Sequence, residues 1–267
     1  MHFEATQVNK IVQDLYNIYH YDIVNYSVPF LQRMLVKFAK KHDCYDFESF
    51  QKLLLHDETL IQNFLNTLHI NVSEMFRDPP VFQQIRKKII PYIASYPIIK
   101  IWSVGCASGQ EVYSLAIMLK EAGLYERSII YATDISKSTI ESAIAGKYKM
   151  QESLKYFENY YLSGGTNKFS QYFDIEGETL IVKDSLKKNI YFATHNIATD
   201  DVFNIFSLII CRNVLIYFDT TLKNRAFNVF QSSLEELGFL ILGKSENINH
   251  DYFQDYDTIN RVYKLKN

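Results

Sequence analysis

The chain has 267 residues, of which 48% are hydrophobic and 15% aromatic, and its formal net charge is −2. This composition can fill the core of one large globular domain or two modest ones, and the small charge excludes a global attraction to nucleic acid or to an anionic membrane. The N-terminus, MHFEATQVNK, lacks a secretion signal, and no uninterrupted apolar run reaches about 18 residues. We therefore expect a globular, cytoplasmic protein with no membrane insertion and no nucleic-acid partner.

The three cysteines, Cys44, Cys106 and Cys211, lie far apart in the chain. An odd number at wide spacing fits neither a disulfide framework nor a zinc site, so we expect reduced thiols and no bound metal. Cys106 and Cys211 adjoin the motifs described below, but the sequence offers no evident histidine partner for a nucleophilic thiol.

Residues 8–96 have a helical pattern, because apolar residues recur at spacings of three and four and glycine is almost absent. The segment 30–41 has an apolar face and a roughly opposite basic face, made respectively of Leu31, Met34, Leu35 and Phe38 and of Arg33, Lys37, Lys40 and Lys41. The basic face suits either a solvated helix surface or a docking surface for an acidic partner. Residues 47–68 predict two more amphipathic helices with a break at His56-Asp57.

After Pro97 the pattern changes to alternating strands and helices. Strands are predicted at 98–104, 128–134, 206–211, 238–243 and 261–265, and helices at 110–123, 136–146 and 221–237. Ser136 is placed to cap a helix and Gly146 to end it. This alternation predicts an α/β fold with a doubly wound, Rossmann-like parallel sheet.

The predicted organisation is an all-α N-terminal domain over residues 1–70 and a sheet domain over residues 71–267. Within the sheet domain, the alternation breaks down between about residues 160 and 195. Short strand-like runs there, separated by turns and ending in NIYFA, predict a small antiparallel β insertion.

Gly105, Ala107 and Gly109 form a G-x-A-x-G pattern at the end of the first predicted strand, just before a helix. Small residues let the backbone approach a ligand, and free amides at a helix start can donate hydrogen bonds to it. The same turn would also serve helix–strand packing alone, so this pattern by itself leaves both interpretations open.

Asp134 ends the second predicted strand, where an acidic side chain in such folds accepts hydrogen bonds from a ribose; simple turn chemistry or a cap shared with Ser136 is the alternative. Together with the G-x-A-x-G loop, it indicates a cofactor containing a nucleoside. Glu111, close to the loop, would repel a pyrophosphate but suits the amine or sulfonium of S-adenosylmethionine. The pattern therefore favours the methyl donor over a dinucleotide.

Five stretches in chain order now support a resemblance, namely INVSEMFRDPPVF at 70–82, GCASGQEVYSLA at 105–116, ATDIS at 132–136, CRNVLIYFD at 211–219 and GKSEN at 243–247. Along nearly its whole length the chain resembles the CheR-type chemotaxis-receptor methyltransferases, which are S-adenosylmethionine-dependent protein-glutamate O-methyltransferases. Departures from the family pattern include Lys244, which stands where histidine is usual, Gln110, where glutamate is often found, and Ser73, where threonine is usual.

The resemblance implies which residues form the site. The cofactor S-adenosylmethionine, with S-adenosylhomocysteine as product, would be bound by Asn71, Ser73, Arg77, Gly105, Gly109, Glu111, Asp134, Asn196, Ile197, Arg212 and Asn213. Glu111 would meet the methionine amine, Asp134 the ribose, and Asn196 with Ile197 the adenosine. Arg77 and Tyr217 would be the catalytic residues, with Tyr217 near the transferring methyl group.

The function implied by the resemblance is methylation of glutamate side chains on the cytoplasmic helices of chemoreceptors by a monomeric enzyme. The basic face through Lys37 and Lys41 could meet the acidic methylation segments. Two alternatives remain open. One is a methyltransferase of the same architecture acting on another protein or a small carboxylate, and the other is a signalling module that binds the cofactor without turnover.

Overall fold

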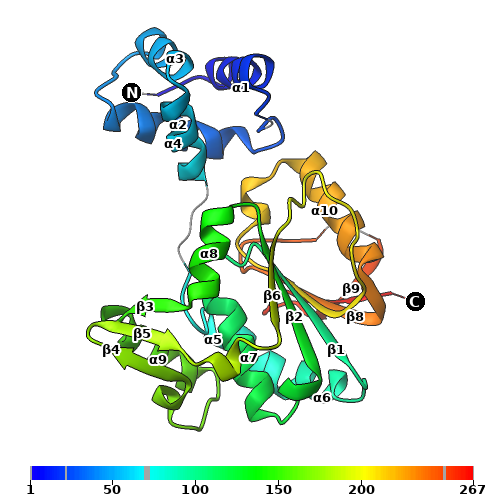
Figure 1. Ribbon diagram of the computed structural model, residues 1–267. Helices are drawn as coiled ribbons and strands as arrows, with labels where there is room; N and C mark the ends of the chain where they lie inside the picture. Colours follow the sequence, from blue (N-terminus) through cyan, green and yellow to red (C-terminus); the bar gives the residue numbers. More distant parts are fainter. Residues whose placement is uncertain (1, 22, 69–72, 249–250, 267) are drawn as a thin grey trace. The chain divides into compact units, whose positions relative to one another are not determined.

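The computed structural model describes residues 2–21, 23–68, 73–248 and 251–266 (Figure 1). Its chain forms two compact units. The helical unit comprises Met1–Ile70 and Tyr217–Asn224, and the sheet unit comprises Asn71–Ile216 and Arg225–Asn267. Among the described residues, no helix is both long and apolar enough to cross a membrane.

The helical unit contains α1 (Ala5–Tyr19), α2 (Val28–Lys41), α3 (Phe47–His56) and α4 (Glu58–Leu68). Asp46 caps α3 by accepting a hydrogen bond from the Ser49 amide at 2.8 Å. Asp57 has an extended backbone, and its Oδ1 accepts a hydrogen bond from the Thr59 amide at 2.8 Å. The predicted break at His56-Asp57 is therefore confirmed, because this side chain supplies the cap for α4.

Helix α2 buries the face that the sequence predicts to be apolar. Leu31, Leu35 and Phe38 are buried and Met34 is half-buried in a core shared with the other helices of the unit. The opposite, basic face is exposed and consists of Arg33, Lys37, Lys40 and Lys41. Both predicted faces are thus confirmed.

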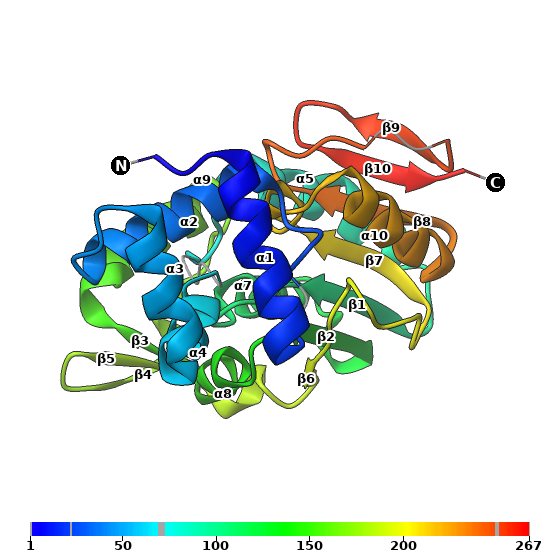
Figure 2. The same ribbon diagram turned by 90° about the horizontal axis from the view of Figure 1, so that it is seen from above.

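The sheet unit is built on a seven-stranded sheet of order β6-β2-β1-β7-β8-β10-β9 (Figures 1 and 2). In chain order its strands are β1 (Ile99–Val104), β2 (Ser128–Asp134), β6 (Ile190–Thr194), β7 (Phe206–Cys211), β8 (Leu234–Leu242), β9 (Phe253–Asp257) and β10 (Val262–Leu265). The first five strands of the order are mutually parallel, and β10 and β9 are antiparallel additions at one edge. The doubly wound α/β prediction is confirmed.

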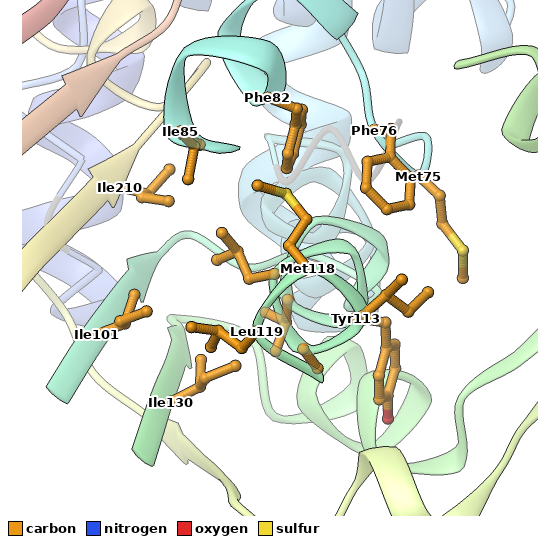
Figure 3. Packing of buried hydrophobic residues seen from close by; sticks show 14 of the residues in the cluster. Met75, Phe76, Phe82, Ile85, Ile101, Tyr113, Met118, Leu119, Ile130 and Ile210 are labelled. Carbon is orange, nitrogen blue, oxygen red and sulfur yellow. The ribbon is translucent and has the colours of Figure 1, made fainter. Parts of the chain in front are cut away.

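Helices cover both faces of this sheet. They are α5 (Pro79–Gln84), the π-helical turn η1 (Ile85–Ile89), α6 (Ile90–Ile93), α7 (Gln110–Glu121), α8 (Lys137–Ala145) and α10 (Thr220–Ser232). Figure 3 shows Ile101, Ile130 and Ile210 pointing from three strands towards Leu119 and its neighbours on α7. Trp102, the next residue along β1, lies on the other face with its ring 5.9 Å from that of Phe230 in α10. This follows from the alternation of side chains along a strand.

Short 3-10 turns connect several of these elements. They are η2 (Tyr125–Arg127), η3 (Met150–Glu152), η4 (Phe169–Tyr172), η5 (Asp184–Leu186) and η6 (Leu215–Tyr217). Ser136 caps α8 by accepting a hydrogen bond from the Thr139 amide at 3.3 Å, and Gly146 ends the helix with a left-handed backbone, φ +60°. Both predicted helix signals are confirmed.

The prediction of a helix over residues 221–237 is wrong at its end. Helix α10 stops at Ser232, and β8 begins at Leu234, which pairs with Phe206 of β7. The sequence SLEEL has helical spacing, but pairing with the free edge of β7 and a left-handed backbone at Leu237, φ +62°, produce an irregular strand instead. The sequence also gives no strand signal for β9, whose residues are mostly exposed.

The insertion, residues 147–182, contains β3 (Lys147–Lys149), α9 (Ser153–Leu162), β4 (Phe173–Glu176) and β5 (Thr179–Val182), and its strands form an antiparallel sheet of order β3-β5-β4. It begins earlier than the residue 160 expected from sequence. The last expected strand, NIYFA, is not part of it, because Ile190 pairs with Ile130 and continues the large parallel sheet as β6. The short strand pattern could not distinguish these two sheets.

Candidate functional site

The candidate site lies where the parallel strands end. The residues predicted to bind the cofactor follow β1, β2, β6 and β7, and the carboxyl ends of parallel strands meet at one edge of a sheet. Strand β1 lies between β2 and β7, so the chain order reverses there. In open α/β sheets this switch point is the usual ligand-binding crevice.

The loop after β1 has an unusual backbone. Gly105, Ala107 and Gly109 have positive φ angles of +65°, +48° and +90°. A Cβ atom on Gly105 would lie 2.4 Å from Cγ2 of Val214, so only glycine fits there. The Ala107 amide donates a hydrogen bond to Oδ2 of Asp134 at 3.0 Å. The loop is thereby tied to the end of β2, and its small residues keep side-chain bulk away from its backbone.

Asp134, the last residue of β2, hydrogen-bonds both to the loop after β1 and to the residue that caps α8. Its Oδ2 accepts the Ala107 amide, and its Oδ1 accepts the Ser136 amide at 3.1 Å. Both are turn contacts of the kind that the sequence left as an alternative to ribose binding. A carboxylate has about four acceptor positions, so each oxygen retains capacity for a ligand hydroxyl.

Glu111 occupies the first turn of α7, where the helix dipole favours a negative charge. Its Oε2 accepts a hydrogen bond from Nη1 of Arg212 at 2.9 Å, and its Oε1 accepts one from the Ser103 hydroxyl at 3.2 Å. The carboxylate is 15% exposed. It is held in place by its partners and still has acceptor capacity on Oε1.

Arg212 is the central cation of this corner, with a side chain that is only 2% exposed. Besides Glu111, its guanidinium binds the Asp78 carboxylate and donates through Nη2 to the Arg77 carbonyl at 3.1 Å. One buried positive charge is therefore shared by two carboxylates. The carboxylate of Glu111, which keeps acceptor capacity on Oε1, suits a cationic ligand. Arg212 acts here by orienting Glu111 and the turn at residues 77–78.

Asn213 follows with a left-handed backbone, φ +62°, and is held by a residue that sequence reasoning missed. Glu246 is 4% exposed, and it accepts the amides of Asn213 at 3.0 Å, Ile216 at 3.2 Å and Gly243 at 2.5 Å. Burial raises the pKa of Glu246, and these backbone donors oppose the rise. The GKSEN motif was the available signal, but nothing in it indicated that its glutamate fastens the turn after β7.

The segment before α5 packs on α7. The Phe76 amide donates to the Ser114 hydroxyl at 2.9 Å, and the Phe76 ring is buried in the core (Figure 3). Ser73 and Arg77, both predicted cofactor residues, are half-buried on either side of this anchor. Asn71, the third predicted residue of the segment, lies outside the described residues.

Asn196 and Ile197 follow β6. The His195 amide donates to the Asp134 carbonyl at 3.0 Å, so this loop lies beside the end of β2. Oδ1 of Asn196 accepts the Ala198 amide at 3.0 Å, and Ile197 is buried. Asn196 and Ile197, which are predicted to contact the adenosine, thus directly follow a residue that is hydrogen-bonded to Asp134, the residue predicted to bind the ribose.

Tyr217 belongs to the helical unit. Its ring centroid lies 4.6 Å from that of Phe30, and its carbonyl accepts the Ser27 amide at 2.8 Å. Its role at the methyl group stays a prediction.

The thiols next to the site are poor nucleophiles. Cys106 and Cys211 are free and buried. Burial raises the pKa of both thiols well above the ordinary value, and nearby carboxylates raise it further. They remain protonated near neutral pH, in agreement with the sequence-based exclusion of a thiol nucleophile. Within the described ranges, no group of three or more metal-ligating side chains is placed to hold a metal ion.

Comparisons with known proteins bear directly on this site. Residues 71–262 match a family model described as "CheR methyltransferase, SAM binding domain", and residues 6–69 match "CheR methyltransferase, all-alpha domain". A Pseudomonas putida protein named "Putative methyltransferase Cher3" is 41% identical over 249 residues, covering 93% of this chain and 91% of that protein.

Two further relatives carry a more specific name. A "Chemotaxis protein methyltransferase" of Listeria innocua is 31% identical over 247 residues, covering 92% of this chain and 91% of its own. One of Borreliella burgdorferi with the same name is 29% identical over 268 residues, covering 94% and 91%. These similarities extend over both units.

Proposed function

The chain belongs to the CheR methyltransferase family, and from this premise we propose that it is a protein-glutamate O-methyltransferase acting on chemoreceptors. Membership confirms the resemblance drawn from the motifs and S-adenosylmethionine as the cofactor. The acceptor rests on the relatives named as chemotaxis protein methyltransferases. The observation that carries the proposal is the carboxylate of Glu111, which is held in place by the buried Arg212 and keeps acceptor capacity on Oε1.

The residues present fit the cofactor. We propose that it is held by Ser73, Arg77, Gly105, Gly109, Glu111, Asp134, Asn196, Ile197, Arg212 and Asn213. The open loop after β1 offers backbone amides without side-chain bulk, as its positive φ angles require. Glu111 supplies a carboxylate for the methionine amine and Asp134 one for the ribose hydroxyls, since both keep unused acceptor positions.

When bound, S-adenosylmethionine supplies an electrophilic methyl group and leaves as the neutral thioether S-adenosylhomocysteine. An ionised glutamate carboxylate is already a nucleophile, so the protein does not need a general base. The protein's task is to align the acceptor oxygen and exclude water from it. For well-oriented reactants, these effects supply on the order of 7 kcal/mol.

Arg77 and Tyr217 are proposed to orient the acceptor. A guanidinium fork can hold a carboxylate in two hydrogen bonds, but a very tight ion pair would weaken the nucleophile. Arg77, which is half-buried beside the predicted cofactor residues, therefore serves geometry more than charge. Tyr217 is assigned from the family resemblance alone, four residues after Asn213 in the chain.

We expect Arg77→Ala and Tyr217→Phe to lower turnover about a hundredfold while changing the Kd of S-adenosylhomocysteine by about threefold or less, because an orienting contact acts on the reacting carboxylate. Steady-state kinetics and calorimetry measure the two effects. If calorimetry finds that either change abolishes binding, that residue holds the cofactor instead.

The exposed basic face of α2 favours an acidic protein acceptor over a small carboxylate. Arg33, Lys37, Lys40 and Lys41 form this face on the helical unit and point to solvent. A small carboxylate would need no such extended surface, whereas acidic receptor segments would be attracted to it.

The test is transfer of a labelled methyl group from S-adenosylmethionine to membranes that contain chemoreceptors. Methyl esters release volatile methanol in alkali, so the label should become volatile. Receptors with glutamine at the methylated positions are the control and should stay unlabelled. Label that resists alkali would exclude ester chemistry, and cofactor binding without any transfer would support a signalling module without turnover.

A further inference from the structure

The insertion contacts two of the chain segments that are proposed to line the methyl-donor site. We propose that Tyr148 and Asn159 of the insertion are positioning residues that hold these segments in the conformation that binds S-adenosylmethionine. This inference rests on the proposed placement of the cofactor against residues 105–109 and 73–77. All of the residues involved belong to the sheet unit.

Tyr148, the central residue of β3, fixes the loop after β1. Its hydroxyl donates to the Ser108 carbonyl at 2.7 Å, and its side chain is buried. Ser108 lies between Ala107 at φ +48° and Gly109 at φ +90°. A left-handed conformation at a residue other than glycine persists only where its surroundings enforce it. Burial raises the pKa of Tyr148 well above its ordinary value, so the hydroxyl remains a donor near neutral pH.

Asn159 of α9 fixes the second segment. Its side chain is 2% exposed, and its Nδ2 donates to the Met75 carbonyl at 3.1 Å and to Oε2 of Glu74 at 3.2 Å. These two acceptors lie between Ser73 and Arg77. A buried amide that donates both of its hydrogens to one short stretch determines the path of that stretch, because leaving these groups unpaired is unfavourable.

A third contact involves a departure from the family pattern. Gln110 accepts the Ser108 hydroxyl at 2.9 Å, and it lies close enough to Tyr156 to oppose the rise that burial causes in the pKa of that hydroxyl, which donates to Oε2 of Glu152 at 2.5 Å. A glutamate at position 110 would bring a second carboxylate to a hydroxyl already used by Glu152. The amide of glutamine supplies a donor instead, which links the insertion to the start of α7.

The three contacts have a common consequence. They connect β3 and α9 to the loop after β1, to the start of α7 and to the segment before α5, so the insertion forms a supporting layer of the donor site. Loss of one contact should therefore weaken cofactor binding in the absence of any acceptor. A merely structural role would change the unfolding midpoint and leave cofactor affinity unchanged.

The decisive comparison is between two tyrosines of the insertion. Tyr148→Phe removes one hydroxyl donor to the loop after β1, whereas Tyr161→Phe removes a hydroxyl donor of the same kind, 3.2 Å from the Asn167 carbonyl, within the insertion itself. Calorimetry with S-adenosylhomocysteine on the full chain should show a Kd about tenfold higher for Tyr148→Phe and unchanged for Tyr161→Phe. Hydrogen exchange of the amides at 105–110 should accelerate only in the first variant.

The substitution Asn159→Asp is an independent test of the same proposal. It keeps the size of the side chain but puts a carboxylate against Glu74 and the Met75 carbonyl, so affinity for S-adenosylhomocysteine should fall at least as far as with Tyr148→Phe. If Asn159→Asp does not fold, the tyrosine pair alone decides. Wild-type affinity and exchange rates in Tyr148→Phe would overturn the proposal, even if its unfolding midpoint were lowered. Because no acceptor is present, an error about the chemoreceptor substrate would not affect this result.

Discussion

Helix α7 carries a glutamate near each end, one paired with the buried Arg212 and the other with the half-buried Arg86, and we infer that the two pairs serve different purposes. Glu111 in the first turn meets Arg212 at 2.9 Å, and Glu121, the last residue, meets Arg86 at 2.5 Å. All four side chains have low exposure: Glu111 is 15% and Arg212 2% exposed, and Glu121 is 10% and Arg86 17% exposed. Distance and burial alone would not distinguish them.

Their remaining hydrogen bonds do distinguish them. Oε1 of Glu121 accepts the hydroxyls of Tyr160 and Tyr172 and the amide of Asn167, so this carboxylate is saturated by protein groups. Within the described part of the chain, Oε1 of Glu111 accepts a single hydrogen bond, from the Ser103 hydroxyl at 3.2 Å. Glu121 also stands at the helix end where the dipole disfavours a negative charge, which explains its need for donors. Unused acceptor capacity, rather than the ion pair, indicates a ligand site.

The largest effect is expected from Arg212→Met. It leaves Glu111 and Asp78 without their shared cation, so the free energy of unfolding should fall by about 3 to 5 kcal/mol and binding of S-adenosylhomocysteine should be lost. Urea unfolding and calorimetry measure the two quantities. Arg212→Lys is the control: it keeps the charge but not the fork, and it should be intermediate in both. A stable Arg212→Met protein with normal binding would contradict the assigned role of this corner.

Glu121→Gln should reduce stability without affecting the cofactor. Nε and Nη2 of Arg86 have no hydrogen-bond partner within the described part of the chain, so removing the opposing charge leaves that guanidinium poorly compensated. We expect the free energy of unfolding to fall by about 2 to 3 kcal/mol and the Kd of S-adenosylhomocysteine to change by less than about twofold. A larger change in Kd at retained stability would show that both ends of α7 serve the ligand.

Glu111→Gln should show the opposite pattern. Arg212 keeps Asp78 and the Arg77 carbonyl as partners, so its charge is not left uncompensated and stability should change by only about 1 kcal/mol. Loss of the carboxylate that is proposed to face the methionine amine should raise the Kd of S-adenosylhomocysteine about tenfold. The same calorimetric and urea measurements apply. If this variant lost stability but kept its affinity, the distinction between the two glutamates would be wrong.

Much of the fold could be predicted from local patterns. The strand at 128–134, the cap at Ser136 and the break at His56-Asp57 follow from apolar periodicity and side-chain chemistry within a few residues, and the structure confirms them. The helix over 221–237 and the placement of NIYFA in the insertion are wrong. In both cases the sheet edge with which a segment pairs determined the outcome, and no local pattern encodes that choice.

The candidate site also contains residues that local sequence identified and residues that it could not identify. Glu111 and Asp134 were found from sequence because each stands at a fixed offset from the G-x-A-x-G loop, within one β-α-β unit. Glu246 and Asn159 were missed because their partners lie far away in the chain; Asn159 and the Met75 carbonyl are 84 positions apart. The sequence around a buried polar residue does not indicate which distant group it will hydrogen-bond to.

The sequence by itself therefore determined most of the alternation of helices and strands, the loop that is predicted to admit a ligand and the acidic residues from which a sulfonium cofactor was predicted. These depend on φ angles, helix caps and side-chain charge, which act over a few residues. Only the tertiary structure decided that Arg212 is shared by Glu111 and Asp78, that Glu246 fastens the turn after β7, and that Tyr148 supports the donor loop. Those contacts exist because folding brings distant segments together, and their geometry depends on the whole sheet rather than on any one stretch of sequence.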